Sequence, residues 1–90
     1  MGRAIRLRSK RLGEKLRHIR VVELDYSQVE MAKALGFPTI HPTNISGFET
    51  GKREPPYPVL LKYARLVGIS TDILIDDDLK IRPNWRKPRK

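Results

Sequence analysis

Three glycines mark the places where a helical apolar pattern stops. Gly36, Gly51 and Gly68 each follow a segment in which apolar residues recur every three or four positions. Glycine readily adopts the left-handed backbone conformation that ends many helices, so each of them predicts a helix C-terminus. A chain of 90 residues with such spacing has room only for short helices and short connections. We therefore expect an all-α fold, a compact five-helix bundle.

The ends of the five expected helices are marked by capping and breaking residues. The second helix, Gln28–Leu35, is the best marked, because Ser27 and Glu30 have the spacing of a capping box ahead of it. The others are expected over residues 12–22, from 41 or 42 to 49, over 58–67, and from 70 or 71 to 75. The side chains expected to face the core are those of Leu12, Leu16, Ile19, Leu24, Met31, Ala32, Leu35, Ile45, Phe48, Leu60, Leu61, Ala64 and Val67.

Composition excludes several classes of protein. Cysteine is absent, which rules out disulfides, thiolate metal sites and a cysteine nucleophile, and with two histidines, His18 and His41, we expect no metal and no cofactor. The sequence has no phosphate-binding glycine loop, nucleophile elbow or HExxH motif, so we do not expect an enzyme. The acidic run at 76–78 lacks the spacing of a calcium loop and is expected to be a solvated turn. Without a membrane span or a secretion signal, a cytoplasmic protein with no membrane partner is expected.

The formal net charge of +9 resides in the two ends of the chain. Residues 1–20 hold eight Arg and Lys against one Glu, residues 81–90 hold five against none, and residues 21–80 hold six against nine acidic groups. A concentrated basic charge favours a nucleic-acid partner, although charge alone does not separate DNA from RNA or from an anionic membrane. We expect a basic arm over 1–11, a globule over 12–78 and a basic tail over 79–90. The tail is either arm-like or merely solvated.

The second and third helices have the layout of a helix-turn-helix, which spacing alone does not distinguish from an ordinary helical hairpin. Several blocks of residues follow one another over residues 12–75: Leu12-Gly13-Glu14-Lys15-Leu16-Arg17, Ser27-Gln28, Met31-Ala32 with Leu35-Gly36, Asn44-Ile45-Ser46 with Phe48-Glu49, Gly51-Lys52-Arg53-Glu54-Pro55, and Leu60-Leu61 with Tyr63-Ala64. In their order and spacing, these blocks resemble the phage repressor/Cro-type (xenobiotic-response-element) helix-turn-helix family. The resemblance implies a lambda-repressor-like DNA-binding domain whose third helix enters the major groove.

The resemblance also implies roles for individual residues. Gln28 would hold a phosphate at a helix N-terminus, where free N–H groups favour an anion; the alternative is a polar residue without a role. Thr43 and Asn44 would touch bases, unless they only cap the helix. The remaining implied DNA contacts are Ser46 and His41, to a base or a phosphate, and Thr50, Lys52 and Arg53, to phosphates. The alternative for His41 is a surface histidine without a role.

An ion pair between Arg20 and Glu49 is implied in the same way. It would tie the first helix to the third and orient the third helix more than it stabilises the fold. The alternative is that both residues are exposed surface charges that contribute less than about 1 kcal/mol.

Two departures from the family pattern affect the predicted DNA contacts. One additional residue lies between Val22 and Tyr26, and about three lie between Gly36 and Ile45. The longer turn either lengthens the third helix at its start or adds a loop. Pro42 and Gly47 stand where the family often has long polar side chains, so we expect fewer direct base contacts.

The sequence therefore predicts a sequence-specific transcriptional regulator of double-stranded DNA, of bacterial or phage type and expected to be a repressor. We expect a homodimer on an inverted repeat, with its interface around the fifth helix and residues 79–81. Basic residues of the N-terminal arm, Arg3, Arg6, Arg8, Lys10 and Arg11, would follow the DNA backbone or enter a minor groove. Two alternatives remain: an antitoxin-type autorepressor that binds a partner toxin, and an adaptor that binds a co-regulator without reading DNA.

Overall fold

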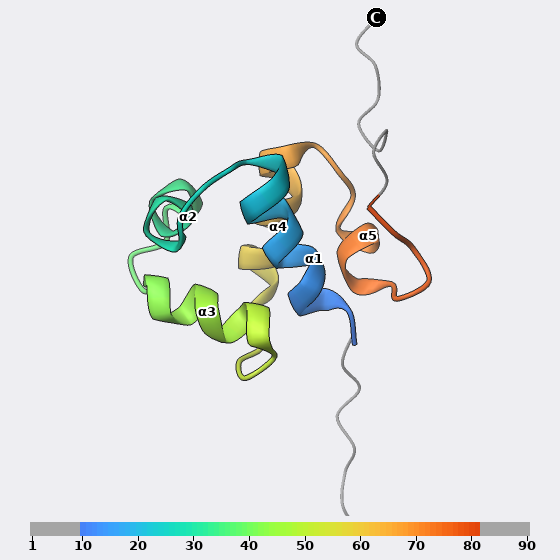
Figure 1. Cartoon of the computed structure of the whole chain (residues 1–90), viewed down its shortest axis with the longest axis horizontal. Helices are drawn as coiled ribbons and strands as arrows, with labels where there is room; N and C mark the ends of the chain where they lie inside the picture. Colours follow the sequence, from blue (N-terminus) through green and yellow to red (C-terminus); the bar gives the residue numbers. More distant parts are fainter. Residues whose placement is uncertain (1–9, 82–90) are drawn as a thin grey trace, which may run out of the picture.

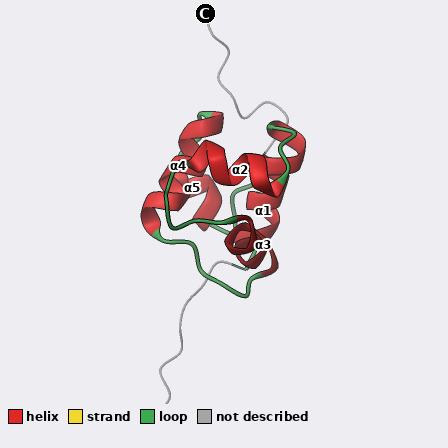
Figure 2. Ribbon diagram, turned by 90° about the vertical axis from the view of Figure 1, so that its left-hand side faces the viewer, coloured by secondary structure: helices red, strands yellow, loops and turns green. Residues whose placement is uncertain are grey.

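The computed structural model describes residues 10–81, and within this range the secondary structure is entirely helical (Figures 1 and 2). The elements are α1 (Leu12–His18), η1 (Ile19–Glu23), α2 (Gln28–Leu35), α3 (Pro42–Thr50), α4 (Tyr57–Val67) and α5 (Thr71–Ile75). The expected five-helix bundle is confirmed. In Figure 1, α1 lies centrally, α2 and α3 lie together on its left, and α5 lies on its right.

The C-terminal part of the first predicted helix is wound as a π-helix. In η1, the Leu24 N–H donates to the Ile19 carbonyl, five residues earlier, at 2.9 Å. A π-turn holds more residues than an α-turn, and so the additional residue expected before Tyr26 is taken up within the helix. Asp25 then adopts a left-handed conformation, with φ 56°, and directs the chain into α2.

The ends of α2 agree with the prediction from sequence. Ser27 Oγ accepts from the Glu30 N–H at 3.0 Å, and Glu30 Oε1 accepts from the Ser27 N–H at 2.8 Å. Gly36 ends the helix with φ 77°. The additional residues that follow form a loop, in which the Ile40 N–H donates to the Phe37 carbonyl. The side chains of Phe37 and Ile40 in this loop pack against the core. Helix α3 begins only at Pro42.

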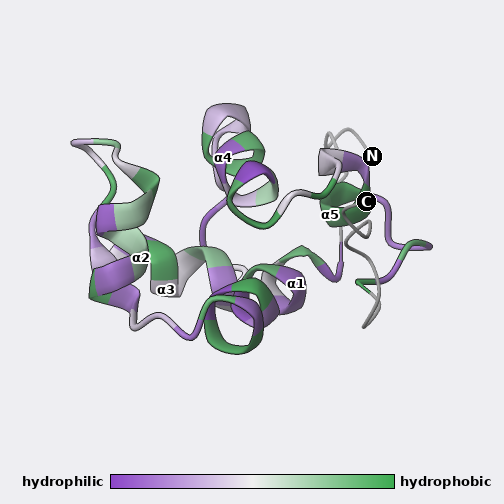
Figure 3. Cartoon of the chain, turned by 90° about the horizontal axis from the view of Figure 1, so that it is seen from above, coloured by the Kyte–Doolittle hydropathy of each residue, from purple (hydrophilic) through white to green (hydrophobic). Residues whose placement is uncertain are grey.

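All six elements contribute buried apolar side chains to one core. Its buried members are Leu16, Ile19, Met31, Leu35, Ile45, Phe48, Val59, Leu60, Tyr63, Ala64, Val67 and Leu74. Figure 3 shows apolar and polar residues on both α1 and α4, as amphipathic packing requires. One expectation is wrong: Leu61 is 40% exposed. The inward direction of α4 is set by Leu60, Tyr63, Ala64 and Val67, and Leu61 lies beside this stripe.

The C-terminal residues of the described chain are bound to α1. Asp77 carboxylate oxygens accept from the Lys10 and Arg11 N–H groups at 2.9 and 3.0 Å, just ahead of α1. The buried Lys15 ammonium donates to the carbonyls of Ile73 and Asp76. The acidic run forms a surface turn as expected, but Asp77 also accepts hydrogen bonds from the segment ahead of α1. Its pKa is lowered because both backbone N–H groups stabilise the carboxylate.

Several predictions fall partly or wholly outside the described residues. The basic arm residues Arg3, Arg6 and Arg8 and the tail over 82–90 lie outside them, and the domain boundaries remain predictions. Between residues 10 and 81, no helix has the length and apolar character needed to cross a bilayer.

Candidate nucleic-acid interface

One face of α3 is turned away from the core. Ile45 and Phe48 are buried against the rest of the bundle, whereas Thr43 and Thr50 are exposed and Ser46 is half-buried. Helical spacing places Thr43, Ser46 and Thr50 on the side opposite the core residues. The helix packs against α1 and α2 and lies along the lower edge of the molecule in Figure 1. The arrangement leaves a polar strip of short side chains, referred to below as the outer face of α3.

The N-terminus of α3 uses one predicted base-contacting residue for capping. His41 is the N-cap residue, and its N–H donates to Asn44 Oδ1 at 2.8 Å. Pro42 occupies the first turn, where its missing N–H costs nothing. Asn44 thus caps the helix in this structure, as the alternative to a base contact proposes. Thr43 is exposed and makes no such hydrogen bond with His41.

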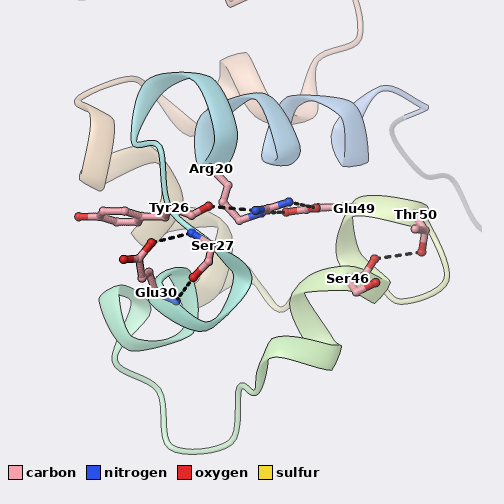
Figure 4. A network of polar contacts seen from close by, with 7 residues as sticks. All are labelled: Arg20, Tyr26, Ser27, Glu30, Ser46, Glu49 and Thr50. Atoms are coloured by element: carbon pink, nitrogen blue, oxygen red, sulfur yellow. Dashed lines mark hydrogen bonds and ion pairs between the residues drawn. The ribbon is translucent and has the colours of Figure 1, made fainter.

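A bidentate ion pair connects η1 with α3 (Figure 4). Arg20 Nε donates to Glu49 Oε2 at 2.6 Å and Arg20 Nη2 to Glu49 Oε1 at 3.0 Å. The two side chains are only 11% and 5% exposed, respectively. Arg20 Nη1 also donates to the Tyr26 carbonyl at 2.9 Å, ahead of α2. One guanidinium therefore contacts both α3 and the connection that leads into α2, and the hydrogen bonds with Glu49 raise its pKa.

A glycine allows α1 and α3 to approach closely. A Cβ atom on Gly13 would lie 2.5 Å from the Glu49 carbonyl oxygen and 3.1 Å from that of Phe48. Both are backbone atoms and cannot move aside independently. The absence of a side chain at Gly13 thus brings the last turn of α3 against the first turn of α1, beside the ion pair at Glu49.

A buried hydroxyl lies in the core near this pair. Tyr63 is fully buried, and its hydroxyl has no hydrogen-bond partner among residues 10–81. Burial raises the pKa of the Tyr63 phenol, and the negative charge of Glu49 adds to this effect. The ring fills the core beneath the ion pair, while its hydroxyl remains unsatisfied.

The C-terminal end of α3 carries the predicted phosphate-contacting residues. Thr50 Oγ1 donates to the Ser46 carbonyl at 3.0 Å (Figure 4), so its hydroxyl hydrogen is used within the helix although the residue is exposed. Gly51 ends the helix with φ 84°. Lys52 and Arg53 follow and are exposed, and they place two positive charges next to the outer face of α3.

Gln28 belongs to a different element from the other predicted contacts. It is the first residue of α2, and its side chain is half-buried. The first N–H groups of a helix have no acceptor within it, and the helix dipole is positive there, so this end favours an anion. Among residues 10–81, no cluster of histidine and carboxylate groups has the arrangement of a metal site.

The element pair α2 and α3 joins two helices by a turn and leaves the second helix at the surface, which defines a helix-turn-helix. A family model described as Helix-turn-helix matches residues 16–74, and the chain belongs to this family. It is also similar to the crystal structure of the P22 c2 repressor protein in complex with synthetic operator 9T in the presence of Tl+. The identity is 28%, the match covers 74% of this chain and 96% of that chain, and the TM-score is 0.63. A search of curated proteins finds no match.

The comparisons confirm the resemblance to phage-repressor-type helix-turn-helix proteins drawn from the sequence. Sequence reasoning nevertheless missed contacts that hold α1 against α3 and against the α5 region. Gly13 was detectable, since a glycine inside a helical pattern suggests a close backbone approach. Lys15 and Asp77 carried no such signal, because their partners lie 58 or more residues away.

Proposed function

We propose that this protein is a sequence-specific regulator of transcription that binds double-stranded DNA through the outer face of α3. The observation that carries this proposal is the exposure of that face, with short polar side chains along it and two cations at its end. An α-helix fits the major groove, where the hydroxyl and methyl groups of Thr43 and the hydroxyl of Ser46 contact base edges. The P22 c2 repressor, to which the chain is similar, was crystallised with a synthetic operator.

The remaining predicted residues act on the DNA backbone in this proposal. Gln28 binds a phosphate at the N-terminus of α2, and the exposed Lys52 contacts a phosphate beyond α3. The predicted phosphate contact of Thr50 requires its hydroxyl to turn away from the Ser46 carbonyl. Such contacts orient the protein without reading sequence. His41 lies at the N-cap of α3 and is exposed, so it adds a contact at the entrance of the groove.

A repressor that acts as a homodimer is the specific form of the proposal. One helix with a few short side chains discriminates weakly among sequences, and two copies on an inverted repeat double the number of base contacts. Ile75 and Leu79 are 47% and 39% exposed, and α5 lies at the end of the molecule opposite α2 (Figures 1 and 3). Ile81, in contrast, packs against the core. Of the apolar residues in the expected interface, only Ile75 and Leu79 are therefore assigned to the dimer contact.

Selection of bound DNA from a random pool tests the proposal directly. We expect enrichment of an inverted repeat whose half-sites lie about 10 base pairs apart. Enrichment of a single half-site, with a monomeric mass in solution and on DNA, would contradict the dimer. Failure to enrich any sequence at a stated salt concentration would favour the adaptor, whereas a toxin that co-purifies with the chain would favour the antitoxin.

A further inference from the structure

The side chain of Arg53 packs on Gly47 of α3, a position that a phosphate contact alone would not require. Gly47 is spaced four residues from Thr43 and three from Thr50, so it lies on the outer face of α3, yet it is buried. The atoms that cover it belong to Arg53. A Cβ atom on Gly47 would lie 2.9 Å from Arg53 Cδ, 3.0 Å from Cγ and 3.3 Å from Cβ.

The backbone fixes this arrangement as well. The Arg53 N–H donates to the Gly47 carbonyl at 3.1 Å, so the loop after Gly51 folds back on the last turns of α3. The Arg53 residue itself remains exposed. Its aliphatic stem therefore lies on Gly47 of α3, while the residue as a whole remains accessible to solvent.

The chemistry of this face gives the arginine a particular role. Thr43, Ser46 and Thr50 are short, and Thr50 already donates its hydroxyl hydrogen within the helix. A guanidinium offers a rigid fork of N–H donors, which matches the O6 and N7 acceptors of guanine in the major groove. A stem immobilised on glycine loses less rotational freedom when it binds than a free arginine would.

We propose that Arg53, seated on Gly47, is a specificity-determining residue that reads a guanine in the major groove. The long polar side chain that α3 lacks at Gly47 is thereby supplied from the following loop. The proposal rests on the proposed function, since it requires that the outer face of α3 meets DNA.

The test is random-pool selection followed by affinity measurement on the selected site and on its single-base variants. The full chain is compared with Arg53→Lys, which keeps the charge but loses the fork, and with Gly47→Ala, which keeps Arg53 but displaces its stem. For both variants, we expect the preference for guanine at one position of each half-site to fall about tenfold or more. Preferences at the other positions should stay unchanged.

Lys52→Ala is the matched control, because it removes the neighbouring exposed cation. It should weaken binding to all sequences alike and lower the salt dependence by about 0.9 in the log–log slope. Thermal unfolding of Gly47→Ala should show no loss of stability, since alanine favours a helix and only a flexible side chain must move.

Two failures are distinguishable. If the wild-type chain enriches no sequence, the proposed function falls and this inference falls with it. If the wild-type chain enriches a site without a guanine preference in its half-sites, or if either Arg53→Lys or Gly47→Ala retains that preference in full, the role of Arg53 as a base reader is wrong while the proposed function stands.

Discussion

The first helix is bound to α3 and to the α5 region by contacts of different kinds. Toward α3, η1 supplies the buried Arg20–Glu49 pair, in which both partners are charged side chains. Toward α5, Lys15 and Asp77 bond with backbone groups of the opposite segment. Removing one partner of the ion pair leaves a buried charge, whereas removing Lys15 or Asp77 leaves only backbone groups near solvent. The connection to α3 should therefore be more sensitive to substitution than the connection to α5.

The largest expected effect comes from Glu49→Ala. It leaves Arg20 nearly buried without a carboxylate, which should lower the free energy of unfolding by about 3 kcal/mol in urea titrations followed by circular dichroism. DNA binding should weaken beyond this loss, because α3 is no longer held against η1. Glu14→Ala removes an exposed carboxylate of α1 and should change stability by less than about 0.5 kcal/mol. Equal effects of the two variants would contradict the assigned importance of the pair.

Gly13→Ala tests the same connection through its geometry. The added Cβ meets backbone atoms of Glu49 and Phe48, so α1 and α3 must separate, at a cost of about 2 kcal/mol. Gly47→Ala is the matched glycine substitution on α3, and it should leave the urea midpoint unchanged or raise it. A midpoint for Gly13→Ala at or above that of the wild type would show that the two helices do not need this close approach.

Lys15→Met tests the connection between α1 and α5, and we expect it to destabilise the fold less than Gly13→Ala does. Methionine retains most of the aliphatic stem, so the change removes mainly the hydrogen bonds with Ile73 and Asp76 and should cost about 1 kcal/mol. Burial lowers the pKa of the Lys15 ammonium, which already offsets part of its contribution. Hydrogen exchange should increase in α5 and remain slow in α3. Increased exchange in both would indicate that α1 transmits the change across the bundle.

Asp77→Asn should have the smallest effect, and it should be visible mainly as a pH dependence. Because the carboxylate pKa is lowered by the Lys10 and Arg11 N–H groups, its stabilising contribution is present above the ordinary pKa of 3.8 and is lost as pH falls through the lowered value. The difference in Tm between wild type and variant should therefore shrink between pH 6 and acid conditions of about pH 2. A constant difference would exclude titration of Asp77 as its cause.

Sequence reasoning predicted the elements whose signals are local. The start and end of α2 follow from Ser27, Glu30 and Gly36, which lie within the element or directly beside it. The prediction for Leu61 was wrong because an apolar residue next to a buried stripe carries the same sequence signal as a member of it. Tyr63 occupies the buried position instead, although its polar hydroxyl argues against complete burial.

The candidate site was predictable only in part. Thr43, Ser46 and Thr50 share the outer face of α3, as helical spacing requires. The contact of Arg53 with Gly47 depends on how the loop folds back after Gly51, which the sequence pattern does not encode. The contacts of Lys15 and Asp77 depend on the packing of distant segments, and so they emerge only from the assembled fold.

The π-turn at Ile19–Glu23 has a consequence for comparing relatives of this chain. The wider turn accommodates one additional residue within the helix, and the connection at Asp25 is therefore not lengthened. We expect relatives that lack one residue here to wind the segment as an ordinary α-helix and to keep the placement of Arg20 beside Glu49. A single-residue gap in an alignment at this point would then correspond to a change of winding, with the geometry on either side preserved.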